Sequence, residues 1–182
     1  MSVVILDAMD REDRLLNILK NMLEEKGEEI HDFKLVDKKI APCRSCGSCA
    51  FITPGKCVIN DDMHEILRAT AKCRTIILLT PIRFGGYPSS LKKAMDKIAL
   101  LVLPSYTVKK GHLLHPPRYG SKALLGIGVL DRITDEQETS FKRLVGNNAL
   151  NLQFPYKALV LKSTENIDSI KNEMNHAIEE VC

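Results

Sequence analysis

Short runs of apolar, β-branched residues alternate along the sequence with longer segments in which apolar residues recur at helical spacing. The clearest short run is RTIILLT at 74–80, and the clearest helical stripe lies within 10–26, ending before Gly27. Parallel strands need long crossover connections, usually helices, and such sheets are buried on both faces. The alternation therefore predicts an α/β chain with a parallel sheet covered by helices on both sides.

Five strands and five helices are expected from this pattern. The strands are predicted at 2–6, 29–36, 74–80, 122–130 and 156–162, and the helices at about 10–26, 60–72, 89–101, 134–150 and 167–181. The simplest arrangement is a flavodoxin-like, doubly wound sheet of order 2-1-3-4-5, and a Rossmann-type nucleotide binder is the alternative. At about 150 residues per domain, the 182 residues indicate one domain, 1–182, with a cysteine-rich insertion loop at about 37–60.

Charge and hydropathy narrow the class of protein. The 26 basic residues nearly balance the 23 acidic residues, so the net charge of +3 does not indicate a nucleic-acid or membrane partner. The first residues, MSVVILDAMDRED, fit neither a signal peptide nor a membrane span. A cytoplasmic protein is expected, and in that compartment clustered cysteines are ligands or redox groups more often than disulfides.

The predicted fold places the ligand site. In open parallel sheets, ligands bind beyond the carboxyl ends of the strands, where the strand order reverses. Loops 7–10, 37–60 and 80–88 follow the first three strands and are expected at that edge. The cysteines should then lie beside the switch point between strands one and three.

Four of the six cysteines form the pattern C-x2-C-x2-C-x7-C, at Cys43, Cys46, Cys49 and Cys57. Closely spaced thiolates followed by a more distant one suit a [4Fe–4S] cluster, and bacterial ferredoxins share the opening spacing. Zinc is an alternative, although its structural sites more often use two separated C-x-x-C pairs. Spare thiols or a redox disulfide remain further alternatives. Cys73 is expected to be a core residue, and nothing assigns a role to Cys182.

Two segments resemble the iron-sulfur flavoproteins of the NADPH-dependent FMN reductase group. One is PCRSCGSCAFITPGKCVINDDM at 42–63, and the other is TPIRFGGYPSSLKKAMDKI at 80–98. The resemblance implies FMN at the switch point of a flavodoxin-like fold and a [4Fe–4S] cluster on the four cysteines. It also implies that the flavin is contacted by Thr80, Pro81, Ile82, Arg83, Phe84, Gly85, Gly86 and Tyr87.

In that loop, glycines would allow close backbone approach to the flavin, and Phe84 and Tyr87 could cover its ring. A plain Gly-Pro turn at a strand end is the alternative. Where the family usually has an aromatic residue, this chain has Arg83. We hypothesise that Arg83 supplies positive charge to a reduced flavin or another anionic ligand.

The first loop departs from the family pattern. The family holds the FMN phosphate with a stretch of Ser, Arg, Gly, Asn and Thr, whereas residues 7–14 here comprise four acids, two arginines, Ala and Met. Carboxylates repel a phosphate dianion, whereas hydroxyls and free amides bind it. FMN binding therefore depends on whether the arginines turn toward the phosphate.

Residues 102–121 are basic, contain no acid and are expected to form a surface loop. The alternative is an arm that reaches a neighbouring subunit or the phosphates of a pyridine nucleotide. Gly126 and Gly128 indicate close backbone approach in the fourth strand, either to a flavin or to a helix.

These observations support two classes of function. The first is an oxidoreductase that couples FMN to a [4Fe–4S] cluster, or uses NAD(P)H to reduce a flavin or small acceptor, with small molecules or proteins as electron donor and acceptor. The second is a non-enzymatic redox-sensing or metal-binding module that has lost FMN. By resemblance, a homodimer or homotetramer is expected.

Overall fold

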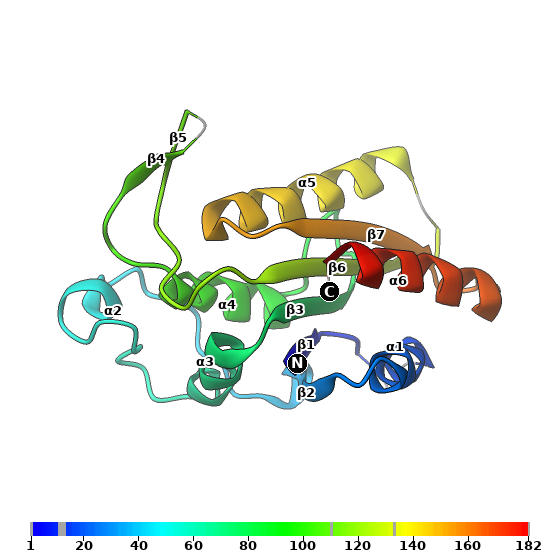
Figure 1. Ribbon diagram of the computed structural model, residues 1–182, viewed down its shortest axis with the longest axis horizontal. Helices are drawn as coiled ribbons and strands as arrows, with labels where there is room; N and C mark the ends of the chain where they lie inside the picture. The colour runs from blue at the N-terminus through cyan, green and yellow to red at the C-terminus, as the bar shows by residue number, and fades with distance from the viewer. Residues whose placement is uncertain (1, 11–13, 110, 133, 182) are drawn as a thin grey trace.

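The computed structural model describes residues 2–10, 14–109, 111–132 and 134–181. Its centre is a parallel sheet of five strands (Figure 1). The strands are β1 (Ser2–Asp7), β2 (Glu29–Lys34), β3 (Thr75–Pro81), β6 (Ala123–Leu130) and β7 (Tyr156–Lys162). Their order, β2-β1-β3-β6-β7, is the predicted 2-1-3-4-5 order, because two hairpin strands precede β6 in the numbering.

Helices cover both faces of this sheet. They are α1 (Arg14–Glu25), α3 (Met63–Lys72), α4 (Ser89–Ile98), α5 (Asp135–Leu152) and α6 (Ile167–Val181). The short helix α2 (Ser48–Phe51) and the 3-10 turns η1 (Leu35–Asp37) and η2 (Ala99–Leu101) lie in the connections. Each predicted strand and helix is present. Helix α3 begins three residues later than predicted, and α4 ends three residues earlier, where η2 continues the chain. The doubly wound prediction is confirmed.

The alternation of side chains along β1 explains the two cores. Val4 and Leu6 pack on one face with α3, α4 and α5, whereas Val3 and Ile5 pack on the other with α1 and α6. The interior strand β3 is buried throughout, apart from partly exposed Pro81, so it has no polar alternation. This explains why its sequence was the clearest strand signal.

Gly126 and Gly128 lie in β6 against the layer of α5. A Cβ atom on Gly126 would lie 2.6 Å from Cγ2 of Val145, and one on Gly128 would lie 2.8 Å from the Phe141 ring. Of the two expected reasons for these glycines, the structure supports close packing against a helix.

Residues 102–121 contain more structure than the predicted surface loop. Strands β4 (Thr107–Lys109) and β5 (His112–Leu114) pair as an antiparallel hairpin that projects from the body of the molecule (Figure 1). Each strand has only three residues, which is too short for a periodic sequence signal.

The expected position of the cysteine loop is wrong. The loop leaves the carboxyl end of β2, but α2 lies at the opposite end of the molecule from α1 (Figure 1). Gly55 approaches Arg118 and Tyr119, which precede β6, and therefore lies toward the amino ends of the strands. About twenty loop residues are long enough to run back along the sheet, a distance that strand order alone does not reveal.

Candidate functional site

The loops after β1 and β3 meet at the carboxyl edge of the sheet. The amide of Ala8 donates to the carbonyl of Leu79 at 2.8 Å, which joins the two strand ends. Farther out, Nη2 of Arg83 lies 2.7 Å from Oδ2 of Asp10, with both side chains more than half exposed. Arg83 therefore offsets part of the negative charge of the first loop by pairing with a carboxylate of the chain itself.

Residues 83–86 form a tight turn. Arg83 and Gly86 exchange two backbone hydrogen bonds of 2.9 Å, and the central residues Phe84 and Gly85 have positive φ values of 51° and 74°. Two positive φ values define a type I′ turn, which glycine favours at its second central position. A Cβ atom on Gly85 would lie 2.9 Å from Cβ of Ser140, so glycine is also needed for contact with α5.

Of the two central residues of this turn, Phe84 is exposed and Gly85 is buried. The Phe84 side chain is fully exposed. Within the described residues, the amides of Phe84 and Gly85 donate to no protein acceptor. Gly85 itself is buried against α5, so the exposed Phe84 ring is the apolar surface at this turn that a flavin ring could contact.

The other predicted contacts in this loop are turned inward. Thr80 and Ile82 are buried, and Pro81 is partly buried. The Tyr87 ring packs edge-on against Phe141 at a centroid distance of 6.1 Å, and its hydroxyl accepts a 3.0 Å hydrogen bond from Asn148. Of the two aromatic residues expected to cover a flavin ring, Phe84 is the one available in this conformation.

The described part of the first loop has few groups that could hold a phosphate. Asp7 is buried and pairs with Lys34 at 2.9 Å, and its Oδ1 accepts from the amide of Met9 at 2.8 Å. Arg14 donates instead to the carbonyls of Ser163 and Glu165, so it does not turn toward the switch point. Residues 11–13 lie outside the described residues. The ring end of an FMN therefore fits this edge, whereas described residues 7–10 do not fit its phosphate.

The cysteine loop turns sharply between its first three thiols. Ser45 and Gly47 have positive φ values of 50° and 70°, and the Ser45 amide approaches Sγ of Cys43 at 3.5 Å. The hydroxyl and amide of Ser48 hydrogen bond to Cys46 and lower the pKa of its thiol.

The four predicted ligands influence one another. Burial is the main cause that raises the pKa of Cys49, and negative charge on Cys57, Cys43 and Cys46 raises it further. Within the described residues, no group of three or more His, Cys, Asp or Glu side chains is arranged to hold a single metal ion. Four thiols in one loop nevertheless fit the donor set of a four-thiolate cluster, which spreads its ligands around several iron atoms.

The base of the cysteine loop is closed by Asp61. Its carboxylate accepts hydrogen bonds from the amides of Ala41 (2.9 Å) and Met63 (3.1 Å), so it joins the two ends of the loop and caps the start of α3. Nζ of Lys97, on α4, donates to the same carboxylate. Lys97 could not be recognised as a site residue from the sequence, because it looks like a solvated lysine of an amphipathic helix.

The remaining cysteines behave as predicted where they are described. Cys73 is buried, its thiol donates to the carbonyl of Thr70, and burial raises its pKa to about 11. Nζ of buried Lys122 donates to the carbonyls of Ala71 and Cys73 at the end of α3. Cys182 lies outside the described residues.

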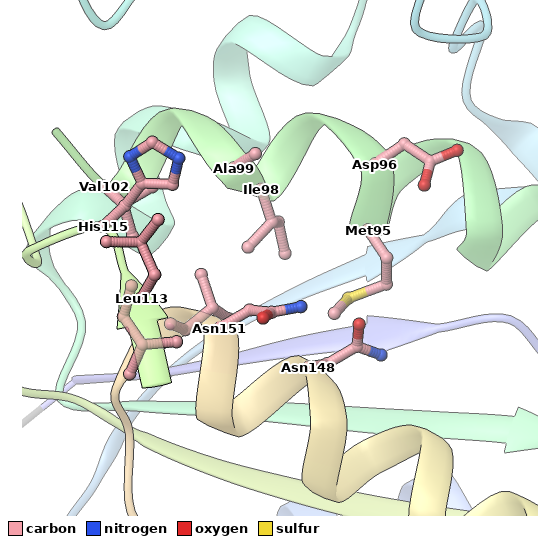
Figure 2. A pocket seen from close by; sticks show the side chains of 11 residues that line it. Met95, Asp96, Ile98, Ala99, Val102, Leu113, His115, Asn148 and Asn151 are labelled. Carbon is pink, nitrogen blue, oxygen red and sulfur yellow. The ribbon is translucent and has the colours of Figure 1, made fainter. Parts of the chain in front are cut away.

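A separate cavity of about 410 Å³ lies between α4, α5 and β5. Figure 2 shows Met95 and Ile98 on one wall, Asn148 and Asn151 on another, and Leu113 at the hairpin side. Asn148 also holds the Tyr87 hydroxyl, so this cavity reaches the end of the 80–87 loop that is turned away from solvent. Nδ1 of His115 contacts the Ser105 carbonyl at 2.9 Å, which ties the hairpin to its own base.

Comparisons with known proteins agree with this geometry. An iron-sulfur flavoprotein of Archaeoglobus fulgidus is 36% identical over 90 residues, which cover 50% of this chain and 45% of that protein. The chain spans about half the length of the curated relatives it matches.

Solved structures share the fold. An NAD(P)H:quinone oxidoreductase from Methanothermobacter marburgensis has a TM-score of 0.70 at 14% identity, with 98% of this chain and 96% of that chain covered. An FMN-dependent NADH-azoreductase from Bacillus anthracis, in complex with FMN, has a TM-score of 0.65 at 15% identity, with the same coverage of 98% and 96%.

None of the helices in the described part of the chain is long and apolar enough to cross a membrane. The family model described as NADPH-dependent FMN reductase matches residues 1–119, which include both predicted site segments. The chain therefore belongs to the NADPH-dependent FMN reductase family.

Proposed function

We propose that this protein is a flavin-dependent oxidoreductase that transfers electrons between a donor such as NAD(P)H and a small molecule or protein acceptor. The observation that carries the proposal is the joint presence of two centres. One is the turn that exposes Phe84 on the switch-point edge, and the other is the loop that carries Cys43, Cys46, Cys49 and Cys57. Family membership and the iron-sulfur flavoprotein relatives support it.

In this proposal, Thr80–Tyr87 holds the ring of FMN, and Cys43, Cys46, Cys49 and Cys57 hold a [4Fe–4S] cluster. FMN supplies hydride chemistry and the cluster supplies one-electron chemistry, so together they link a two-electron donor to a one-electron partner. The chain's own contribution is to expose Phe84 at this edge and to keep Arg83 beside Asp10.

The two centres favour an assembly of several chains. Loop 80–87 precedes α4, whereas the cysteine loop reaches the segment that follows it, and ten helical residues span about 15 Å. Exposed Phe51 and Ile52 beside the cysteines, and exposed Val108 and Leu113 on the hairpin, offer apolar contact surface. A homodimer or homotetramer in the cytoplasm is therefore part of the proposal, with the flavin of one chain near the cysteine loop of another.

A second candidate function is a redox-sensing or metal-binding module without FMN. It is favoured by the first loop, in which the amides of Ala8 and Met9 are already bonded within the protein and Asp7 and Asp10 add negative charge. Only the cysteine loop would then carry function.

Anaerobic purification, followed by quantification of iron, acid-labile sulfide and flavin per chain, separates these functions. The first predicts about four irons, four sulfides and one FMN per chain. Iron and sulfide without flavin, even after FMN is added, would favour the second. Protein that contains neither and cannot be reconstituted with iron and sulfide would contradict both.

A further inference from the structure

A cavity of about 520 Å³, here called the α3 cavity, lies beside the cysteine loop and away from the switch-point edge. The cysteine loop contributes Lys56 and Asn60, α3 contributes Leu67 and Arg68, η2 contributes Leu100, and Tyr119 completes the wall. Its volume lies within the range of about 300–1,000 Å³ that is typical of small-molecule sites.

The lining divides into an apolar floor and a basic rim. Leu67 and Leu100 are buried residues of the main core and form the floor. Lys56 and Arg68 are exposed at the rim, and neither forms an ion pair with a described acid. Among the described residues, no acidic side chain lines the cavity. The lining therefore favours a ligand that has both an apolar body and a negative charge.

The wall of the cavity that carries Tyr119 lies close to the cysteine loop at Gly55. Gly55 has a φ of +78°, and a Cβ atom there would lie 3.4 Å from both the Tyr119 hydroxyl and Nε of Arg118. Arg118 in turn donates to the carbonyls of Leu100 and Val102. Tyr119 is thus held opposite α3, where its half-exposed ring can contact a planar ligand.

We propose that the α3 cavity binds a planar aromatic molecule that carries a carboxylate or sulfonate. The ring lies on the apolar floor beside Tyr119, the anionic group contacts Arg68 and Lys56, and Asn60 offers an amide for a further hydrogen bond. Nε2 of His64, another lining residue, lies 2.9 Å from the carbonyl oxygen of Cys57, so the ligand sits directly beside the cysteine loop. The site is separate from the flavin edge and does not depend on a bound cofactor.

The test is isothermal titration of the purified protein with 2-naphthoate and with 2-naphthamide, which has the same rings and no charge. We expect saturable 2-naphthoate binding at one site per chain, with submillimolar affinity, and at least tenfold weaker binding of 2-naphthamide. No binding of 2-naphthoate, or equal binding of the two compounds, overturns the proposal.

Variants locate the site. Arg68→Glu should weaken 2-naphthoate binding at least tenfold, whereas Lys72→Glu, the same charge reversal on an exposed residue of α3 outside the cavity, should change it less than twofold. Equal weakening by both variants would mean a general charge effect and overturn the proposal. Ala71→Leu, which fills the cavity, should also abolish binding, and thermal melts identify any variant that fails to fold.

The same titration on Cys43→Ser separates this site from the proposed cluster, because Cys43 does not line the cavity. Binding of 2-naphthoate should persist in this variant when iron is lost. Loss of both iron and 2-naphthoate binding, in protein that remains folded, would overturn the independence of the site.

Discussion

Lys97 and Asp61 form a buried ion pair that joins α4 to the base of the cysteine loop, with side chains only 1% and 7% exposed. The same Asp61 carboxylate accepts the amides of Ala41 and Met63. One buried acid therefore holds both ends of the loop, and one buried lysine compensates its charge. The geometry of the cysteine loop depends on this pair, although Lys97 is far from the cysteines in the sequence.

Replacement of Lys97 by Met should destabilise the fold by about 3–5 kcal/mol, because it leaves the Asp61 carboxylate buried without its cation. Urea unfolding at pH 7 measures the change. In Lys97→Met/Asp61→Asn, which removes both charges, the loss should be clearly smaller than the sum of the single losses. Additive losses would contradict an ion pair that acts as a unit.

The same variant should respond to acid. Burial acts to raise the pKa of Asp61, but hydrogen bonds from Lys97 and Ala41 outweigh it and hold the pKa below its ordinary value of 3.8. The ion pair therefore stabilises the wild type above pH 3.8. This contribution to stability is lost as the pH falls through the lowered pKa of Asp61. Without Lys97 the pKa of Asp61 is higher, so the stability difference between wild type and Lys97→Met should narrow as the pH falls toward and below about 4.

Asp10→Asn should raise the affinity for FMN by roughly three- to tenfold, since it removes a carboxylate near the expected phosphate and releases Arg83. Arg83→Ala should lower the affinity for FMN. Fluorescence titration checks both, with riboflavin as the control because it has the same ring and no phosphate. An equal effect of Asp10→Asn on riboflavin would contradict a phosphate-directed explanation.

Tyr87 should make the protein unstable at high pH. Burial raises the pKa of its hydroxyl from 10 to about 12, with the Asn148 hydrogen bond acting in the opposite direction. The pKa of Tyr87 is higher in the folded state than in the unfolded state. Its contribution to the free energy of unfolding is therefore fully present below about pH 10 and is lost between pH 10 and 12. The loss is about 2–3 kcal/mol.

Urea unfolding at pH 9, 10 and 11 tests this expectation, with Tyr87→Phe as the matched variant. Tyr87→Phe loses the Asn148 hydrogen bond, so it should be less stable than wild type at pH 9 by about 1 kcal/mol. Its stability should then fall less steeply as the pH rises. Parallel declines in the two proteins would assign the alkaline loss to other groups, such as the buried thiol of Cys73.

The fold was predictable because its signals are local. Buried runs such as β3 have no polar alternation, and the stripe of α1 has helical period, so type and order could be derived from neighbouring residues alone. The hairpin β4–β5 was missed because three-residue strands carry no period. Its pairing depends instead on Gly111 and on contacts such as the Lys109–Gln153 hydrogen bond.

The candidate site was predictable only in part. Cysteine spacing depends on ligand chemistry and is visible in sequence. The position of the loop depends on long-range contacts at Asp61, Lys97 and Gly55, which spacing does not encode. Tyr87 looked like a ligand contact because an aromatic residue beside glycines has the same sequence signature whether its ring faces solvent or the core.

Gly126→Ala should destabilise the fold by about 1–3 kcal/mol, because the new methyl group would lie 2.6 Å from Cγ2 of Val145. Thermal or urea unfolding measures it. Val145→Ala alone also costs stability, but in Gly126→Ala/Val145→Ala the new methyl occupies vacated space, so the double loss should be smaller than the sum. Additive losses would mean that the two residues do not compete for the same volume.

Cys57→Ser should abolish iron binding, whereas Cys73→Ala should preserve it, and this pair gives the most direct test of the cysteine loop. Serine is a poor ligand for iron–sulfur clusters, so removal of any one of the four thiolates should reduce iron and acid-labile sulfide from about four per chain toward zero. Cys73 lies in the core, donates to the Thr70 carbonyl and has a pKa raised to about 11, so its thiol is neutral and unsuited to a metal.

Both variants are purified without oxygen and compared by iron assay and visible absorbance. Equal iron in Cys57→Ser and wild type would remove Cys57 from the ligand set, and loss of iron from folded Cys73→Ala would show that the ligands were assigned incorrectly.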